Sequence, residues 1–176
     1  MHADERMNIF LTGEINAGKS RLIDAFLKEY SGSVGGYKTV REKTSLDEFF
    51  GIYLLDIRDL DAPLTIDNRV GTCFPDRTLG CHSDVLEKAG IYALTFDVVP
   101  SLIVMDEIGV LEKNCTAFKN KISECLDSDT NVLGVIKKKR SRFLDTISAR
   151  PDVTTLEVAG ISREQLLHTL KCYLSV

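Results

Sequence analysis

One short segment of the chain has the spacing GxxxxGK(S/T): Gly13-Glu14-Ile15-Asn16-Ala17-Gly18-Lys19-Ser20. Glycines at these positions let the backbone turn tightly, so that successive N–H groups point at one phosphate. The lysine then reaches the β- and γ-phosphates, and the serine hydroxyl is a ligand for Mg²⁺. The segment therefore predicts a P-loop that binds a nucleoside triphosphate with Mg²⁺. The alternative is a glycine-rich turn that binds no ligand.

The predicted nucleotide-binding residues are Gly13, Glu14, Ile15, Asn16, Ala17, Gly18, Lys19, Ser20 and Arg21. Ser20 is also a predicted metal ligand, and Lys19 has a predicted catalytic role because its charge meets the phosphates that react. Glu14 is negative, so its carboxylate must face away from them. The helix that follows aims its positive N-terminal end at the same phosphates.

A pair of acids, Asp106-Glu107, follows the apolar run of residues 101–105. In a parallel sheet the carboxyl end of such a strand faces the crevice where ligands bind. We predict that Asp106 holds Mg²⁺ through water, and that Glu107 orients and deprotonates the attacking water. The alternative is that both acids simply end a strand in solvent.

Positive charge gathers in Lys137-Lys138-Lys139-Arg140 and Arg142, after a predicted strand. Such a run is either a solvated face or a group that neutralises charge developing on the γ-phosphate. Arg41 and Arg142 are our candidates for the second role. Arg58, Arg69 and Arg77 are other cations that the sequence does not rank. Nucleic acid is not an expected partner, because no aromatic residues interleave with the run.

Apolar runs alternate with amphipathic segments along most of the chain. The pattern predicts strands over 8–12, 101–105, 131–136 and 153–158, and helices over 19–30, 83–95, 115–126, 141–149 and 162–174. This alternation predicts an α/β fold of three layers, a mostly parallel sheet with helices on both faces. Residues 36–80 form a β-rich insert, in which 52–57 and 64–66 are expected to pair as a hairpin. Ser83 and the pair Ser162 and Gln165 are predicted helix caps.

The composition limits the class of protein. The chain has 176 residues, 44% hydrophobic and 27% charged, as expected for one globular domain over 1–176 with its core from residue 7. No window approaches the ~18 apolar residues of a membrane span. A net charge of −4 argues against broad binding to nucleic acid. Five cysteines without a CxxC pair or a secretory signal indicate reduced thiols and predict a cytoplasmic protein.

Beyond single motifs, the sequence resembles the small nucleoside-triphosphatase family of thermophiles, whose animal members are called cancer-related nucleoside triphosphatases. Besides the P-loop, residues 36–41 are similar to the family's G-F-x-T-x-E-V-R stretch with one residue dropped. Residues 106–112 (DEIGVLE) are similar to its DEIGKMEL, with Val110 in place of lysine. Residues 147–153 and 158–166 resemble its I-x-x-R-x-D-V and V-T-x-x-N-R-x-x-L segments, whereas residues 58–95 match poorly.

This resemblance implies a RecA-like P-loop core and slow hydrolysis of ATP, GTP and other triphosphates with Mg²⁺. Two further hypotheses stay open on the same motifs. The chain is either a small-molecule kinase, with residues 58–95 forming the acceptor pocket, or a nucleotide-sensing module that changes shape for a protein partner.

Overall fold

The structure is a computed structural model that describes residues 7–43, 49–74, 78–109, 114–138 and 141–174. Within these residues, eight strands form one sheet in the order β5-β4-β3-β2-β6-β7-β1-β8. The strands are β1 (Asn8–Thr12), β2 (Val34–Lys43), β3 (Phe50–Asp56), β4 (Arg69–Cys73), β5 (Thr78–Cys81), β6 (Leu102–Ile108), β7 (Asn131–Ile136) and β8 (Val153–Glu157). The helices are α1 (Lys19–Leu27), α2 (Ser83–Ala93), α3 (Thr116–Asp127), α4 (Arg142–Ser148) and α5 (Arg163–Leu174).

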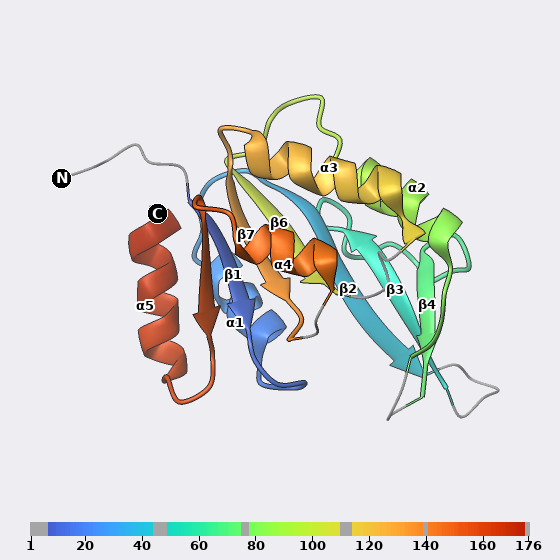
Figure 1. Ribbon diagram of the computed structural model, residues 1–176, viewed down its shortest axis with the longest axis horizontal. Helices are drawn as coiled ribbons and strands as arrows, with labels where there is room; N and C mark the ends of the chain where they lie inside the picture. Colours follow the sequence, from blue (N-terminus) through green and yellow to red (C-terminus); the bar gives the residue numbers. More distant parts are fainter. Residues whose placement is uncertain (1–6, 44–48, 75–77, 110–113, 139–140, 175–176) are drawn as a thin grey trace.

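The sheet has a parallel part and an antiparallel part (Figure 1). Strands β2, β6, β7, β1 and β8 run parallel to one another, and β3, β4 and β5 continue the sheet from β2 with antiparallel pairs. The carboxyl ends of β1, β6 and β7 therefore share one edge of the sheet. The predicted P-loop and acid pair both lie at this edge.

Helices cover both faces of the sheet, which explains why its central strands are apolar throughout (Figure 1). On one face, α1 and α5 bury apolar residues such as Phe26 and Leu170 against β1, β6 and β7. On the other, α2, α3 and α4 bury Leu86, Phe118 and Ile147. The predicted three-layer α/β fold is confirmed.

The predicted hairpin between 52–57 and 64–66 is wrong. Strand β3 pairs instead with β4, with Phe50 opposite Cys73 and Ile52 opposite Gly71. Residues 64–66 lie in a loop, where Ile66 is 70% exposed and the Asn68 side chain accepts a hydrogen bond from the Thr65 amide at 2.8 Å. Residues 64–66 have only two apolar side chains, with a threonine between them. They offer less apolar surface for burial than β4, which buries Val70 and Cys73.

Two of the predicted caps have different outcomes. The Ser162–Gln165 capping box is confirmed, because the Gln165 amide donates to Ser162 Oγ and the Ser162 amide donates to Gln165 Oε1. At α2 the N-cap position is His82 and no side chain caps it, so the cap predicted at Ser83 is wrong. Helix α1 also ends earlier than predicted, at Leu27. No helix in the described part of the chain is long and apolar enough to cross a membrane.

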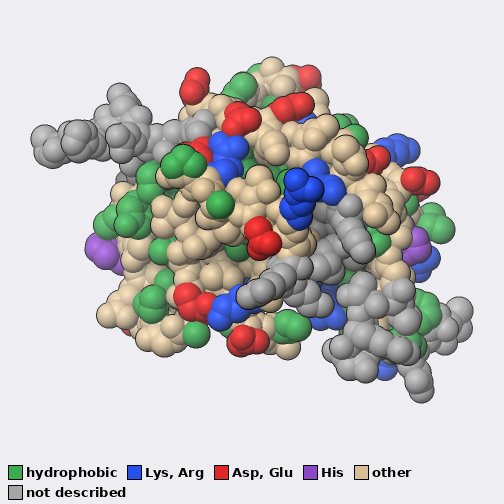
Figure 2. All heavy atoms as spheres, viewed as in Figure 1, with side chains coloured by type: hydrophobic (Ala, Val, Ile, Leu, Met, Phe, Trp, Pro, Cys, Tyr) green, Lys and Arg blue, Asp and Glu red, His purple; other side chains and the backbone are tan. Residues whose placement is uncertain are grey.

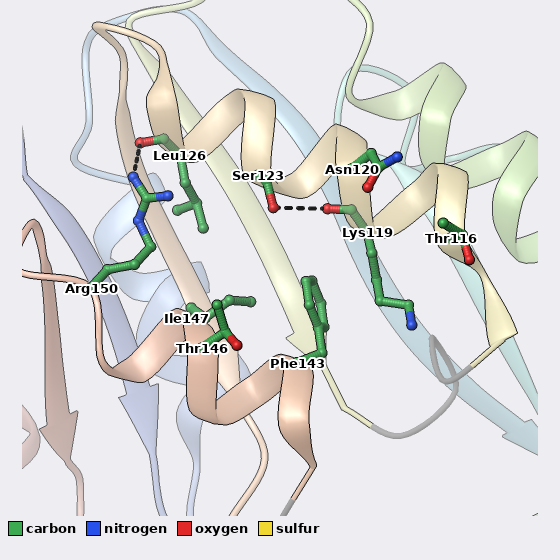
Figure 3. A pocket seen from close by; sticks show the side chains of 9 residues that line it. All are labelled: Thr116, Lys119, Asn120, Ser123, Leu126, Phe143, Thr146, Ile147 and Arg150. Carbon is green, nitrogen blue, oxygen red and sulfur yellow. Dashed lines mark hydrogen bonds between the residues drawn. The ribbon is translucent and has the colours of Figure 1, made fainter.

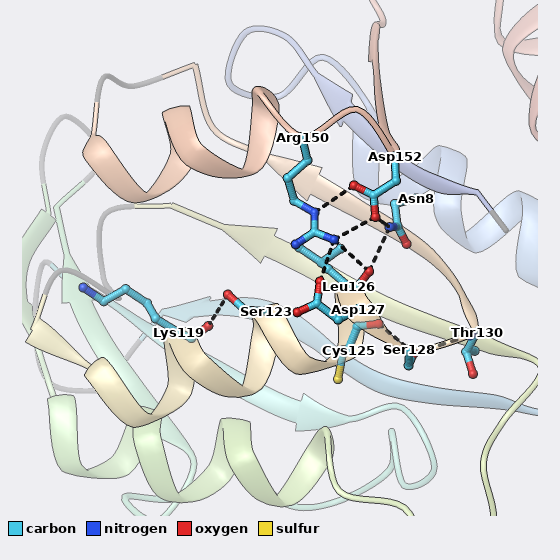
Figure 4. A network of polar contacts seen from close by, with 10 residues as sticks. All are labelled: Asn8, Lys119, Ser123, Cys125, Leu126, Asp127, Ser128, Thr130, Arg150 and Asp152. Carbon is cyan, nitrogen blue, oxygen red and sulfur yellow. Dashed lines mark hydrogen bonds and ion pairs between the residues drawn. The ribbon is translucent and has the colours of Figure 1, made fainter.

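A network of polar contacts joins three elements at the edge of the sheet opposite the P-loop (Figure 4). The Arg150 guanidinium donates to both carboxylate oxygens of Asp152 at 2.9 and 2.7 Å, to Asp127 at 2.7 Å and to the Leu126 carbonyl at 3.2 Å. The buried amide of Asn8 donates to the same Leu126 carbonyl and to Asp152. The network therefore ties the end of α3 to the starts of β1 and β8.

Replacing Arg150 with alanine is expected to lower the free energy of unfolding by about 1.5–3 kcal/mol, because it removes hydrogen bonds to charged groups that are only partly exposed. The midpoint of urea denaturation measures this loss. The matched control is Lys121→Ala, which removes the amine of a more exposed pair with Glu124 and is expected to cost less than about 1 kcal/mol. Equal midpoints for both variants would contradict a structural role for the network.

Candidate active site

The P-loop turn depends on backbone conformations that favour glycine. Gly13 has φ 148° and Gly18 has φ 85°, and Asn16 adopts the left-handed region with φ 63°. A Cβ at residue 13 would lie 2.8 Å from Val158 Cγ2 and 2.9 Å from Glu157 Oε1, so a side chain is excluded there by β8. At residue 18 nothing lies within 4 Å of that position, and glycine is favoured by the backbone angle alone.

The lysine of the loop is bent back over the turn. Lys19 Nζ donates to the carbonyl oxygens of Gly13 at 2.9 Å and Glu14 at 2.6 Å. Residues 14–17 around it are exposed, and Ile15 is 73% exposed. The amine therefore lies at the mouth of the loop, where an anionic group can reach it from solvent.

Helix α1 and strand β6 meet through a side-chain hydrogen bond at the sheet edge. Ser20 Oγ donates to Asp106 Oδ1 at 3.0 Å, although the two residues are 86 positions apart. Asp106 is fully buried, and its Oδ2 has no hydrogen-bond partner among the described residues. Burial raises the pKa of Asp106 to about 6; the Ser20 hydrogen bond opposes this shift.

A buried carboxylate with one unpartnered oxygen beside a hydroxyl fits a site for a hard cation. No cluster of three or more His, Cys, Asp or Glu that could hold a metal occurs in the described ranges. The protein donors at this point are thus one hydroxyl and one carboxylate, which leaves the remaining positions to phosphates and water. Mg²⁺ has this preference, whereas a structural zinc site takes four protein ligands.

Glu107, the second acid, is partly exposed and is paired with a lysine. Its Oε2 lies 3.3 Å from Lys137 Nζ, and the two side chains are 26% and 29% exposed. Strand β6 continues through both acids to Ile108, so the pair lies within the end of the strand and not after it. Glu107 is therefore accessible to water at the same edge of the sheet as the P-loop.

Comparison with known proteins agrees with this geometry. A family model described as NTPase matches residues 8–171 of the chain. The chain belongs to this NTPase family. The nucleoside-triphosphatase THEP1 of Thermotoga petrophila is 30% identical over 166 residues, which are 92% of this chain and 89% of that protein.

Two solved structures share the fold of this NTPase family member. The crystal structure of THEP1 from the hyperthermophile Aquifex aeolicus has a TM-score of 0.70 at 17% identity and covers 97% of this chain and 100% of that one. The solution structure of a human cancer-related nucleoside triphosphatase has a TM-score of 0.70 at 23% identity, with 96% and 97% covered. The resemblance inferred from the motifs is confirmed.

The structure distributes the predicted cations over different parts of the molecule. Arg41 Nη2 lies 2.7 Å from Cys73 Sγ, and its guanidinium carbon lies 6.0 Å from the Phe50 ring centre, in the antiparallel part of the sheet. Arg142 is exposed at the start of α4. The structure thus does not bring Arg41 into contact with the P-loop. Residues 139–140 of the basic run, Arg77, and residues 110–112 of the DEIGVLE segment lie outside the described residues.

Lys138, the next residue of the basic run, is held by acids from two other segments. Its Nζ lies 2.6 Å from Glu157 Oε2 and 4.0 Å from Glu14 Oε1. The hydrogen bond to Lys138 also lowers the pKa of Glu157. Glu14 therefore faces this rim lysine, which agrees with the expectation that its carboxylate turns away from bound phosphates.

Two charged residues near Asp106 were missed by the sequence analysis. Lys38 on β2 stands opposite Asp106 in the strand pairing, and it forms an ion pair with Asp24 on α1. The Lys38 side chain is only 14% exposed. Asp24 lies one turn after Ser20, so helical spacing places it on the same face of α1 as Ser20. Nothing in the sequence indicated, however, that β2, which carries Lys38, lies next to β6.

A cavity of about 240 Å³ lies beside the P-loop. It is lined by Ala17, Gly18, Arg21, Leu22, Val158, Ile161, Arg163 and Leu166. Arg163 Nη2 also donates to the Arg21 carbonyl at 3.4 Å, so α5 and α1 meet at its floor. This cavity brings the predicted P-loop residues together with the loop after β8, which the sequence analysis did not assign to the site.

A second cavity, of about 280 Å³, lies between α3 and α4 on the opposite face of the sheet from α1 (Figure 3). Its wall includes Phe143, with Lys119 Nζ 5.7 Å from the ring centre, and Arg150 of the polar network. Residues 58–95 line neither of these two cavities. The acceptor pocket that the kinase hypothesis expects in that segment therefore has no counterpart in them.

Proposed function

We propose that the chain is a Mg²⁺-dependent nucleoside-triphosphate phosphohydrolase, which converts ATP, GTP or another nucleoside triphosphate to the diphosphate and phosphate. The observation that carries the proposal is the 3.0 Å hydrogen bond between Ser20 and the buried Asp106, with the water-accessible Glu107 next in the chain. Relatives that are nucleoside-triphosphatases by name support the same activity.

In this proposal the P-loop amides and Lys19 bind the β- and γ-phosphates. Lys19 exchanges its hydrogen bonds to two loop carbonyls for charge-assisted bonds to phosphate, which are stronger. Ser20 and Asp106 would hold Mg²⁺, which would offset the negative charge of the phosphates. Binding of the triphosphate thus uses groups that the folded chain already holds together.

Glu107 is the proposed general base. Its carboxylate accepts a proton from a water molecule as the water oxygen forms a bond to the γ-phosphorus. The bond between that phosphorus and the β–γ bridging oxygen breaks, and its electrons stay on the diphosphate. The products are inorganic phosphate and a nucleoside diphosphate, so no acceptor other than water is needed.

The cavity beside the P-loop is the proposed site of the base and ribose. Val158 and Ile161 offer aliphatic surface to a ligand. Arg21 and Arg163 add guanidinium groups, which can stack on an aromatic ring such as a nucleotide base. The side chains that line it include no carboxylate and no amide.

We also propose that residues 1–176, with the core from residue 7, act as a single domain in the cytoplasm. All strands of the described residues belong to one sheet, with no second sheet that would serve as a separate core. None of the five cysteines forms a disulfide, as in a reducing compartment. Acidic and basic side chains are interspersed on the face seen in Figure 2, which supports a nucleotide and not a nucleic acid as the partner.

A panel of nucleoside triphosphates tests the proposed function. Purified protein is incubated separately with ATP, GTP, CTP and UTP, and released phosphate is measured with Mg²⁺ and again with excess chelator. Release from several of them is expected, and chelation is expected to abolish it. Formation of nucleoside diphosphate that appears only when a small-molecule acceptor is added, without release of inorganic phosphate, would establish a kinase instead. Tight binding without turnover would establish a sensing module.

A further inference from the structure

Lys137 follows the last residue of the strand that separates the P-loop strand from the acid strand. Strand β7 lies between β1 and β6, and Leu11 pairs with Val135. Lys137 comes two residues after this pair on β7, as Gly13, the first residue of the P-loop, does on β1. The Lys137 amide donates to the Ile108 carbonyl at 3.0 Å. The backbone of Lys137 is therefore held at the end of β6, next to the acid pair, at the edge of the sheet that carries the P-loop.

The side chain of Lys137 crosses the end of β6 to reach Glu107. A Cβ at residue 109 would lie 2.7 Å from Lys137 Cδ, so the aliphatic stem lies against Gly109. Its amine ends 3.3 Å from Glu107 Oε2, and the side chain is only 29% exposed. The charge of Lys137 is thus directed at the site and not at bulk solvent.

The neighbouring lysine has a different environment. Lys138 is 48% exposed and pairs with Glu157 at 2.6 Å, on the β8 side of the P-loop. Of these two consecutive cations, Lys137 alone meets the acid that the proposed reaction uses.

A bound triphosphate changes the balance of charge around Lys137. The terminal phosphate offers an amine several charged oxygens, whereas Glu107 offers one carboxylate at the edge of hydrogen-bonding range. The Lys19 amine is held in a similar way, since it donates hydrogen bonds to loop carbonyls that phosphate oxygens can replace. Both amines are therefore held near the site by protein oxygens that a phosphate outcompetes.

We propose that Lys137 binds the γ-phosphate, and that it leaves Glu107 when a triphosphate enters. The exchange frees the Glu107 carboxylate to accept a hydrogen bond from the attacking water. A diphosphate has no γ-phosphate, so in its presence Lys137 stays on Glu107. This inference rests on the proposed function, since it assigns a residue of this chain to the recognition of the phosphate that is released.

Titration calorimetry with two ligands tests the exchange: ADP, and an ATP analogue with a non-hydrolysable β,γ-methylene bridge, each with Mg²⁺. The wild-type protein is expected to bind the analogue more tightly than ADP. Lys137→Met keeps an unbranched stem over Gly109 but removes the charge. It is expected to weaken the analogue about 10-fold or more, the usual size of a lost hydrogen bond to a charged group, and to leave ADP unchanged. Lys137→Arg is expected to restore most of the difference.

The control is Lys121→Ala, which removes a lysine on α3 that pairs with Glu124. It is expected to bind both ligands as the wild type does. If Lys137→Met weakens both ligands equally, or weakens neither, the inference is overturned while the proposed function stands. If the wild-type protein binds neither these two ligands nor the corresponding guanine, cytosine and uracil nucleotides, the proposed function fails and this inference fails with it. Thermal melting of each variant establishes that it is folded.

Discussion

Replacing Glu107 with glutamine is expected to lower the turnover number for triphosphate hydrolysis by about 100- to 10,000-fold, the usual contribution of a general base. Glutamine has nearly the same shape but accepts no proton from water. The P-loop, Lys19 and the Ser20–Asp106 hydrogen bond are untouched, so the dissociation constant for the triphosphate is expected to change little. Single-turnover phosphate release, with calorimetry of binding alongside, measures the two effects separately.

The matched control for this substitution is Glu29→Gln. Glu29 is an exposed glutamate near the end of α1 that pairs with Lys171. Its replacement is expected to leave turnover unchanged, because the pair is distant in the fold from the sheet edge that holds Glu107. Full turnover by the Glu107 variant would remove that residue from the mechanism and would leave the P-loop without an identified base.

The phosphate-binding part of the site could be predicted because its requirements are local. The backbone turn at Gly13 and Gly18 and the helix that follows are determined within a few residues, and the structure has positive φ angles at both glycines. The contact between Ser20 and Asp106 spans 86 residues and bridges two strands that β7 separates. The sequence analysis placed both residues at one edge of the sheet from a general property of parallel sheets, whose strands all end at the same edge.

The parts that escaped prediction depend on which strands are neighbours. Lys38 comes to lie beside Asp106 only because β2 pairs with β6, and a sequence pattern gives no information on that pairing. The Glu157 side chain lies against Gly13 because β8 pairs with β1. The hairpin was mispredicted for a related reason, since several weak apolar runs in residues 52–73 could each have paired with β3, and turn residues alone did not select β4.

The polar network gives a physical role to one segment of the family resemblance. Arg150 and Asp152 belong to the stretch similar to I-x-x-R-x-D-V, and they lie at the edge of the sheet opposite the P-loop. There they join the end of α3 to the starts of β1 and β8, through Asn8 as well. A segment similar to a family motif thus contributes contacts that hold the sheet and α3 together.

Asp106 is expected to respond to substitution in opposite directions for activity and for stability. Asp106→Asn removes the carboxylate proposed to hold Mg²⁺, and hydrolysis is expected to fall about 100- to 1,000-fold, as for other losses of groups that stabilise charge in the transition state. In the nucleotide-free protein, however, the ionised carboxylate is fully buried, and its Oδ2 accepts no hydrogen bond from the described residues. Removing that charge is therefore expected to stabilise the fold.

The sign of the pH dependence follows from the direction of the pKa shift. Burial raises the pKa of Asp106 from 3.8 to about 6, so the folded chain binds a proton more tightly than the unfolded chain. The wild-type protein thus loses stability from this group as pH rises from about 4 to about 6, and the full penalty, at most roughly 3 kcal/mol, applies above that range. Asparagine carries no such penalty, although its amide N–H groups cost about 1–3 kcal/mol if they find no partner.

Relative to that of the wild type, the free energy of unfolding of Asp106→Asn is therefore expected to rise by up to about 3 kcal/mol between pH 4 and pH 7.5, and to exceed that of the wild type by up to about 2 kcal/mol at pH 7.5. Urea denaturation at the two pH values, without nucleotide or Mg²⁺, measures this. A variant that is less stable at pH 7.5 would indicate that the carboxylate supports the fold. A stability gain together with lost hydrolysis is the result expected if the charge is retained at position 106 to bind a cation, at a cost to the stability of the empty protein.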